Sequence, residues 1–296
     1  MVDILDNINK KIYDSIVGEE NYIKNKIAYI LGGQPGSGKS SFTKHNQNQV
    51  NVKGAIVING DDYRAFHPNY NQIVSTDIRD MPNKTQPFVN NVVETMLSTL
   101  SDENYNLIIE GTLRTSTVSQ TTCEKLKSKG YNTSLIIVAC DAEISWLSTI
   151  SRAEEMAKTG EYPRFVPIEK YNTIVSNISH NLDYLRSQNC FDHVLVADRA
   201  GNVLYRETDI EKPSKALDFA LNLKNWKQKY LQYAVEFANE QKRIMAIYND
   251  TTVETLCTKA NVTSALEHTL AAFSDLELEN ANEPADDFDF KYYPNP

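Results

Sequence analysis

Long apolar runs, an export leader and paired cysteines are all missing from this 296-residue sequence. No run approaches the roughly 18 apolar residues that a membrane-spanning helix needs. The first residues, Met1 to Asp6, have neither the basic start nor the apolar stretch of a signal peptide. The cysteines, at positions 123, 140, 190 and 257, form no CxxC pair and have no histidine at zinc-binding spacing. We therefore expect a cytoplasmic protein with reduced, mostly buried thiols and no membrane partner.

Basic residues are also in short supply. Lys and Arg number 30 against 39 Asp and Glu, which gives a formal net charge of −9. Residues 274–296 contain seven acidic residues and one lysine, so this tail carries −6 of the total and the rest is nearly neutral. An acidic chain is a poor partner for nucleic-acid phosphate, and we expect none. A hydrophobic content of 41% is enough for a sizeable core, which indicates a globular protein.

Short, uniformly apolar runs recur along the first two thirds of the chain, and such runs are typical of buried parallel strands. They lie at residues 27–31, 54–58, 106–109, 134–139 and 193–197, with 202–205 as a candidate sixth. Helix-like spacing is found at residues 3–26, 39–48, 85–101, 117–129, 142–158 and 167–188. The alternation predicts an α/β fold in three layers, with a mainly parallel sheet and right-handed crossovers.

Beyond Pro213 the pattern changes, because helical spacing continues at residues 215–249 and 253–273 but no strand signal returns. The chain is thus predicted to contain a core with an N-terminal helix over residues 1–212 and a helical C-terminal extension over 213–273. The acidic tail, residues 274–296, is predicted to be mobile.

A glycine-rich loop follows the first predicted strand and precedes a predicted helix. The pattern GxxxxGK(S/T), extended here by one serine, is met by Gly33, Gln34, Pro35, Gly36, Ser37, Gly38, Lys39, Ser40 and Ser41. In this strand–loop–helix context the backbone N–H groups surround a polyphosphate. Lys39 would then reach the β- and γ-phosphates, and the Ser40 hydroxyl would ligate Mg²⁺. The motif predicts a P-loop kinase-like fold.

The sequence favours ATP as the nucleotide. A GTPase should carry an NKxD motif, and the nearest candidate, Asn83 to Gln86, lacks the aspartate. The strand at 106–109 ends in Glu110 rather than in the Asp that is usual for motor and multi-subunit ATPases. Glu110 is therefore open to two roles, one beside a Mg²⁺-bound water and one facing the substrate.

Candidate residues for the acceptor side follow the second strand. Asp61 and Asp62 should lie beside the phosphate loop, because ligands bind at the carboxyl ends of parallel strands. A kinase needs a carboxylate there to deprotonate the acceptor hydroxyl, although an Asp before a helix is equally a common N-cap. Arg152, in a predicted helix, and Arg164, in a predicted loop, are candidates to stabilise the moving phosphoryl group.

Together these motifs resemble the zeta toxin family of bacterial toxin–antitoxin systems. The resemblance covers about residues 25–210. It is carried by the phosphate loop, the segment from Asp61 to Tyr70 with its HPNY sequence, the segment NLIIEGTLRT at 106–115, Arg152 with Glu154, and Arg164 before Pro167. The phosphate loop alone is generic, whereas the HPNY and IEGTxRT segments are more specific.

The resemblance implies an ATP-dependent kinase that phosphorylates the 3′-hydroxyl of UDP-N-acetylglucosamine, a toxic activity that blocks cell-wall synthesis. Lys39 and Ser40 would hold ATP and Mg²⁺, Asp61 would be the general base, and Arg152 and Arg164 would contact the transferred phosphate. Contacts to the sugar nucleotide would come from Glu94, Glu110, Thr112, Arg114 and, as a weaker match, Thr122. Leu113 occupies the variable position of the IEGTxRT segment, and the resemblance assigns no role to its apolar side chain.

Two alternatives remain open at this point. One is a P-loop kinase for another acceptor, such as a nucleic-acid end, an antibiotic or another metabolite; the other is a nucleotide-dependent binding module without catalysis. The resemblance also implies inhibition, either by a separate epsilon-type antitoxin protein or by a segment of the same chain. The C-terminal helices or the acidic tail are the candidates for such a segment.

Overall fold

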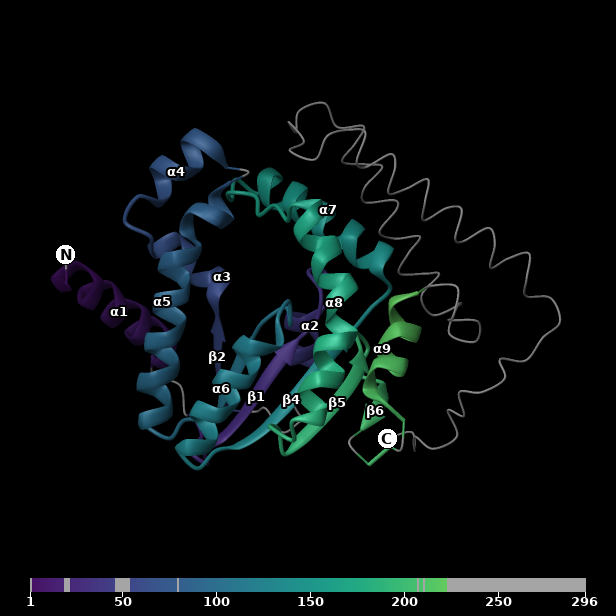
Figure 1. Ribbon diagram of the computed structural model, residues 1–296. Coiled ribbons are helices and arrows are strands. Elements are labelled where there is room, and N and C mark those ends of the chain that lie inside the picture. The colour runs from purple at the N-terminus through teal and green to yellow at the C-terminus, as the bar shows by residue number, and fades with distance from the viewer. Residues whose placement is uncertain are drawn as a thin grey trace.

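Six strands form one sheet at the centre of the protein (Figure 1). The computed structural model describes residues 2–18, 22–45, 54–78, 80–206, 208–209 and 211–222. The strands are β1 (Ile27–Gly32), β2 (Ile56–Asn59), β3 (Leu107–Glu110), β4 (Asn132–Ala139), β5 (His193–Asp198) and β6 (Val203–Arg206). Their order is β2-β3-β1-β4-β5-β6, and all neighbours are parallel except β6, which runs antiparallel to β5. The predicted mainly parallel α/β fold is confirmed.

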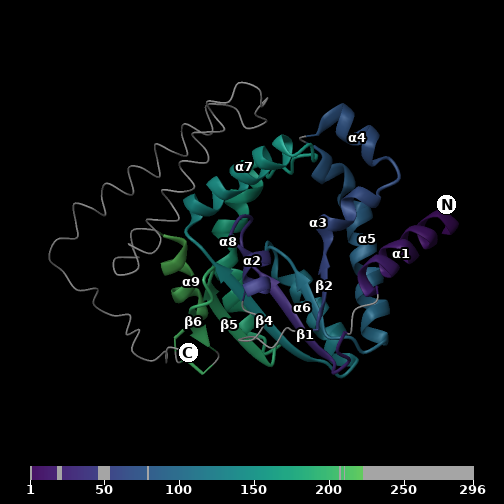
Figure 2. The same ribbon diagram turned by 180° about the vertical axis from the view of Figure 1, so that it is seen from behind.

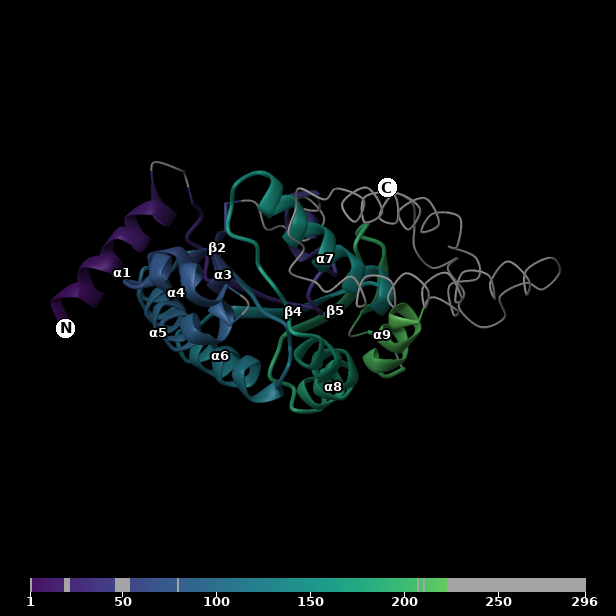
Figure 3. The same ribbon diagram turned by 90° about the horizontal axis from the view of Figure 1, so that it is seen from above.

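Helices cover both faces of this sheet. They are α1 (Val2–Val17), α2 (Lys39–His45), α3 (Gly60–Tyr63), α4 (Tyr70–Asp77), α5 (Met81–Asp102), α6 (Ser116–Ser128), α7 (Ala142–Lys158), α8 (Ile168–Ser187) and α9 (Pro213–Leu221), with a 3₁₀ turn η1 (Arg64–Phe66) after α3. Seen along the sheet, α5, α6, α8 and α9 lie on one side and α7 on the other (Figure 3). The view from behind shows α2 following β1 (Figure 2). Within the described part of the chain, every helix is too short or too polar to cross a membrane.

The core alternates between the two faces of the sheet. In β1, Ala28 and Ile30 belong to the larger apolar cluster beneath α5, α6 and α8, whereas Tyr29 and Leu31 belong to the smaller one, which includes Phe42 of α2. Because both faces are covered, the central strands are apolar along almost their whole length rather than alternating with polar residues. This explains why the sequence reveals the strands as uninterrupted apolar runs.

Some helix boundaries differ from the predicted ones. The N-terminal helix ends at Val17 instead of continuing to residue 26, because Gly18 adopts a left-handed φ of +38°. Helix α5 begins at Met81, with Pro82 in its first turn, four residues before the predicted start. Helices α3 and α4 were not predicted. They build the chain that follows β2, and thus the acceptor side of the candidate site.

The predicted division of the chain at residue 212 stays a prediction. Helix α9, just beyond it, packs against α8, β5 and β6 and contributes Leu217 and Ala220 to the larger core cluster. The remaining predicted extension and the acidic tail, residues 223–296, lie outside the described residues.

Candidate active site

The phosphate loop (residues 33–41) joins β1 to α2 at the carboxyl edge of the sheet. Gly36 has a φ of +78°, and a Cβ atom there would lie 2.0 Å from the carbonyl oxygen of Ser145. Gly33 has a φ of +148°, and its Cβ would lie 2.6 Å from the carbonyl oxygen of Val138. Both positions require glycine, because the backbone conformation and the neighbouring carbonyls leave no room for a side chain. The loop fits the tight course that a phosphate-binding nest needs.

Gln34, one of the predicted nucleotide-binding residues, has a fully buried side chain. Its Nε2 donates to the carbonyl oxygen of Cys140 at 2.5 Å and to Oγ of Ser145 at 3.3 Å. The side chain therefore braces the loop against the end of β4 and the start of α7. Only the backbone of Gln34 is left to contact a nucleotide.

Lys39 lies across the loop at the start of α2. Its Nζ donates to the carbonyl oxygens of Gly33 at 2.8 Å and Gln34 at 3.1 Å. Burial lowers the pKa of Lys39 to about 8, the nearby charge of Glu110 opposes this shift, and the charge of Arg152 adds to it. The ammonium group is thus held at the loop among charged side chains of both signs, and its contact with the β- and γ-phosphates stays a prediction.

Acidic side chains follow β2 and β3 at the same edge. Burial raises the pKa of Glu110, while the charge of Lys39 and a hydrogen bond from Ser40 oppose the shift. Burial likewise raises the pKa of Asp62, and the neighbouring Asp61 adds to it. The structure therefore brings Glu110, Asp61 and Asp62 into one electrostatic group with Lys39 and Ser40, as the strand ends predict.

Asn59, rather than either aspartate, caps helix α3. It is the N-cap of α3, and its Oδ1 accepts a hydrogen bond of 3.1 Å from the backbone N–H of Asp61. The capping role that the sequence left open for Asp61 or Asp62 is therefore taken by the preceding residue. Both carboxylates are left to interact with other groups.

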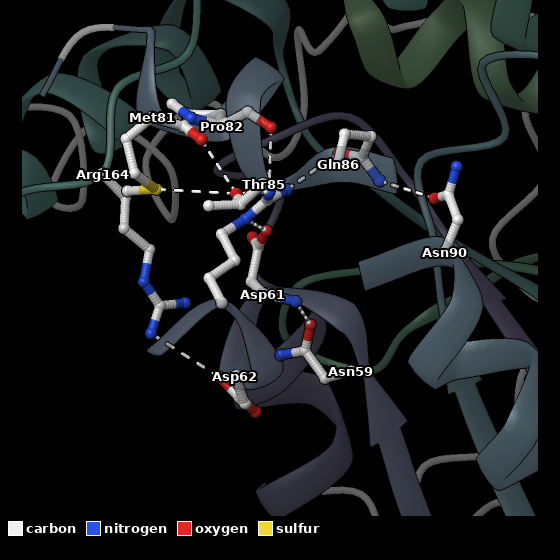
Figure 4. A network of polar contacts seen from close by, with 10 residues as sticks. Asn59, Asp61, Asp62, Met81, Pro82, Thr85, Gln86, Asn90 and Arg164 are labelled. Carbon is white, nitrogen blue, oxygen red and sulfur yellow. Dashed lines mark hydrogen bonds and ion pairs between the residues drawn. The ribbon is translucent and has the colours of Figure 1, made fainter. Parts of the chain in front are cut away.

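Each of these aspartates faces arginine. Arg64 Nε donates to Asp61 Oδ1 at 2.9 Å, and Arg164 Nη2 lies 3.6 Å from Asp62 Oδ1 (Figure 4). Burial alone would raise the pKa of Asp61, but the charge and hydrogen bond of Arg64 and the charges of Arg164 and Arg152 hold it below its ordinary value. Arg152, in α7, and Arg164, in the loop before α8, thus both influence the charge of Asp61, and their expected contact with a transferred phosphate stays a prediction.

The segment after β3 contains two further predicted residues, Thr112 and Arg114. Between them Leu113 is buried in the larger core cluster with a left-handed φ of +52°. Asn181 of α8 donates from Nδ2 to the carbonyl oxygens of Leu113 at 3.0 Å and Arg114 at 2.9 Å. Leu113, which had no expected role, therefore anchors the segment, and Asn181 fixes its backbone.

Glu94 and Thr122 lie on helices α5 and α6. Glu94 is exposed, and its Oε2 is 3.3 Å from Nζ of Lys125 in α6. Thr122 is buried in α6. Their part in binding a substrate stays a prediction.

The sequence analysis missed Arg64, Asn181 and Lys170 as members of this site. Burial lowers the pKa of Lys170 in the first turn of α8, the charges of Arg114 and Arg64 lower it further, and Asp61 opposes them. Lys170 therefore shares the electrostatic environment of the acceptor side. The spacing of Arg64, three residues after Asp61, indicates a helical ion pair, but such pairs usually lie at the surface and do not mark a site residue. No local signal distinguishes Lys170 or Asn181.

The chain is similar to known proteins in sequence and in fold. The sequence pattern of the Zeta toxin family matches residues 14–210. A toxin zeta of Streptococcus pyogenes is 35% identical over 222 residues, which cover 73% of this chain and 76% of the relative. The toxin PezT of Streptococcus pneumoniae serotype 4 is 36% identical over 184 residues, or 62% of this chain and 72% of the relative.

A solved structure is similar over most of the chain. It belongs to the PezAT chromosomal toxin–antitoxin system of Streptococcus pneumoniae, with a TM-score of 0.72 and 26% identity, and covers 84% of this chain and 98% of that one. The shared sequence pattern spans the phosphate loop, Asp61, Glu110 and both candidate arginines. The chain belongs to the zeta toxin family.

Proposed function

We propose that this protein is an ATP-dependent kinase that phosphorylates the 3′-hydroxyl of UDP-N-acetylglucosamine. The observation that carries the proposal is the joint placement of a phosphate loop containing Lys39 and of Asp61, whose carboxylate interacts with the charges of Arg152 and Arg164. A nucleotide-binding module without catalysis has no need of such a carboxylate beside the phosphate loop. Membership of the zeta toxin family supports the same reading.

In the proposed reaction, Asp61 takes the proton from the sugar hydroxyl as the oxygen forms a bond to the γ-phosphorus of ATP. The bond between that phosphorus and the oxygen bridging to ADP breaks, and ADP leaves with the electron pair. Lys39, Arg152 and Arg164 neutralise the charge that develops on the transferred group and on the leaving phosphate. The low pKa of Asp61 keeps it ionised at neutral pH, which is the state that accepts a proton.

The residues present also fit a Mg²⁺ ion beside the phosphate loop. The Ser40 hydroxyl interacts with Glu110, so an alcohol and a carboxylate, both oxygen ligands, are close together at the start of α2. Mg²⁺ bound there would neutralise the charge of the β- and γ-phosphates. Because Glu110 interacts with Lys39, Ser40 and Asp61, it is suited to either of its two expected roles.

The acceptor is proposed to lie against the segment that follows β3, with Thr112 and Arg114 as contacts. The support for this is the fixed backbone of the segment, which Leu113 and Asn181 hold in place. Phosphorylation of a cell-wall precursor would make the protein toxic to its host. The relation to PezAT, described as a toxin–antitoxin system, supports a separate antitoxin as its partner.

A direct assay tests the activity. The purified protein is incubated with ATP, Mg²⁺ and UDP-N-acetylglucosamine, and the sugar nucleotide is examined by mass spectrometry. We expect it to gain one phosphate, with no gain for the Lys39→Ala variant, which cannot compensate the phosphate charge. ADP release with a different acceptor, but not with this sugar nucleotide, would instead favour a kinase for another metabolite.

A further inference from the structure

Arg64 is the most completely bonded charged side chain beside Asp61. The residue is only 8% exposed and cannot reach a substrate directly. Its Nε donates to Asp61, its Nη1 to the Pro82 carbonyl oxygen at 2.9 Å and to Thr85 Oγ1 at 2.7 Å, and its Nη2 to Gln86 Oε1 at 3.0 Å. Four of the five guanidinium donors therefore have acceptors, three of them in the first turns of α5.

These acceptors are themselves held in place. The Thr85 hydroxyl donates to the Met81 carbonyl oxygen at 2.8 Å, so its lone pairs face the guanidinium group. Gln86 donates from Nε2 to Asn90 Oδ1 at 2.7 Å, which leaves its Oε1 turned toward Arg64. Figure 4 shows Thr85 and Gln86 converging with Asp61 on a common centre. The planar guanidinium group of Arg64 is thus held in place by α5 as well as by Asp61.

Asp61 is the open end of this network. Its side chain is 45% exposed, against 10% for Arg64. Because Nε binds Oδ1, we expect the second oxygen, Oδ2, to be the atom that accepts a proton. The direction of that oxygen depends on the guanidinium plane, which α5 determines.

We propose that Arg64 is a positioning residue, which aims the Asp61 carboxylate at the acceptor hydroxyl and transmits the rigidity of α5 to it. This rests on the proposed function, in which Asp61 is the general base. A misplacement of about 1 Å in a reacting group typically costs on the order of 10²-fold in rate. Loss of Arg64 should therefore lower kcat while leaving the KM for ATP nearly unchanged.

Removal of Arg64 also changes the charges around Asp61. The remaining groups are Asp62 on α3, Lys39 on α2, Glu110 at the end of β3, Arg152 on α7, Arg164 in the loop before α8, and Lys170 on α8. Burial raises the pKa of Asp61, and Arg64 is the largest opposing influence. The acidic limb of the rate profile should therefore move to higher pH when Arg64 is replaced.

The test compares Arg64→Gln with Arg186→Gln, the same chemical change near the far end of α8. Arg186 contacts Asn189 and Tyr205, about 24 Å along the helix from Lys170. For Arg64→Gln we expect kcat to fall on the order of 10²-fold, the KM for ATP to stay within about twofold, and the acidic limb to shift upward. Arg186→Gln should leave all three as in the parent protein. An unchanged pH profile and an unchanged kcat in folded Arg64→Gln protein would overturn the proposal.

Two further variants separate positioning from stability. Arg64→Lys keeps the charge but cannot make four directed bonds, so we expect a low kcat with an acidic limb close to that of the parent. In an Asp61→Asn background, Arg64→Gln should add little further loss, because Arg64 acts through that carboxylate. Fully additive losses would overturn the proposal. If Arg64→Gln does not fold, Gln86→Leu is the substitute, because it removes the hydrogen bond to Arg64 Nη2 and keeps Arg64 itself. It should lower kcat only when Asp61 is present.

A readout without substrate keeps this inference distinct from the proposed function. The carboxyl carbon of Asp61 is titrated by NMR in the intact protein and assigned by difference from Asp61→Asn. If the parent protein does not phosphorylate the sugar nucleotide, the proposed function fails. An upward shift of the Asp61 titration in Arg64→Gln would still support the Arg64–Asp61 coupling, and an unchanged titration would overturn it.

Discussion

The phosphate loop and the acceptor side of the site, which follows β2, lie side by side, yet they are formed in different ways. The loop depends on backbone conformation, because Gly33 and Gly36 have positive φ and leave no space for a Cβ atom. The acceptor side depends on side chains, because Asn59 caps helix α3 and Arg64 binds the carboxylate of Asp61. A site formed by backbone conformation depends on a few adjacent positions, which tolerate little change in sequence. A site formed by a side-chain network depends on residues from elements that are distant in the sequence.

The difference also separates binding from chemistry. Lys39 is held by the loop's own carbonyl oxygens, within six residues of the glycine turn. Asp61 is held through Arg64 by helix α5, about twenty residues further along the chain. Nucleotide binding should therefore follow the loop, and turnover should follow the network. The predictions below test that separation.

The largest expected effect is that of Asp61→Asn. The amide cannot take the proton from the sugar hydroxyl, so kcat should fall about 10³-fold while nucleotide affinity stays nearly unchanged. Steady-state kinetics and calorimetric titration with ATP measure the two quantities separately. Asp62→Asn is the matched control and should cost less than about tenfold, since its contact to Arg164 is a partly exposed ion pair. Equal losses of ATP affinity in Asp61→Asn and Lys39→Ala would contradict the separation of roles.

A glycine substitution tests the loop side. Ala at position 36 would meet the Ser145 carbonyl oxygen and must displace the loop, so Gly36→Ala should weaken ATP binding about 30-fold, equivalent to about 2 kcal/mol. Gly130 has nearly the same φ, +83°, but the nearest atom to its added Cβ would be 3.8 Å away. Gly130→Ala should therefore lower stability through backbone strain alone. Calorimetric affinities that fall equally in both variants would show that space in the loop does not matter.

The same contrast explains what could be predicted from the sequence. Strand positions and the phosphate loop were predictable because buried parallel strands and glycine turns leave local patterns. The Arg64 network was not, because an arginine three residues from an aspartate usually marks a solvated surface pair. Its burial comes from α5, whose early start and contact to Arg64 depend on tertiary packing. Asn181 is 67 residues from the Arg114 carbonyl that it binds, so no local pattern connects them.

Titration of Lys39 gives a smaller effect on the loop side. Its folded-state pKa, about 8, lies below the ordinary lysine value of 10.5, so the ammonium begins to lose its proton as pH rises through 8. If only the charged form binds phosphate, ATP affinity should fall about tenfold between pH 7 and pH 9. The free energy of unfolding should rise between pH 8 and 10.5, because the unfolded chain then binds more protons.

The matched variant for this titration is Lys39→Arg, which keeps a positive charge throughout the range. Its ATP affinity, measured by calorimetry, should be lower overall but should not decline between pH 7 and pH 9. A parallel decline in both proteins would mean that another group controls the pH dependence.

The smallest expected effect concerns the segment after β3, where backbone and side-chain construction meet. Asn181→Ala removes two hydrogen bonds to the carbonyl oxygens of Leu113 and Arg114 and should release the left-handed turn at Leu113. We expect KM for the sugar nucleotide to rise roughly fivefold, equivalent to about 1 kcal/mol, with little change in KM for ATP. Asn177→Ala, an exposed position one turn earlier on α8, is the control and should alter neither value. If Asn181→Ala raised KM for ATP as much as KM for the sugar nucleotide, the segment would serve the loop as well as the acceptor, and the two sides of the site could not be treated as separate.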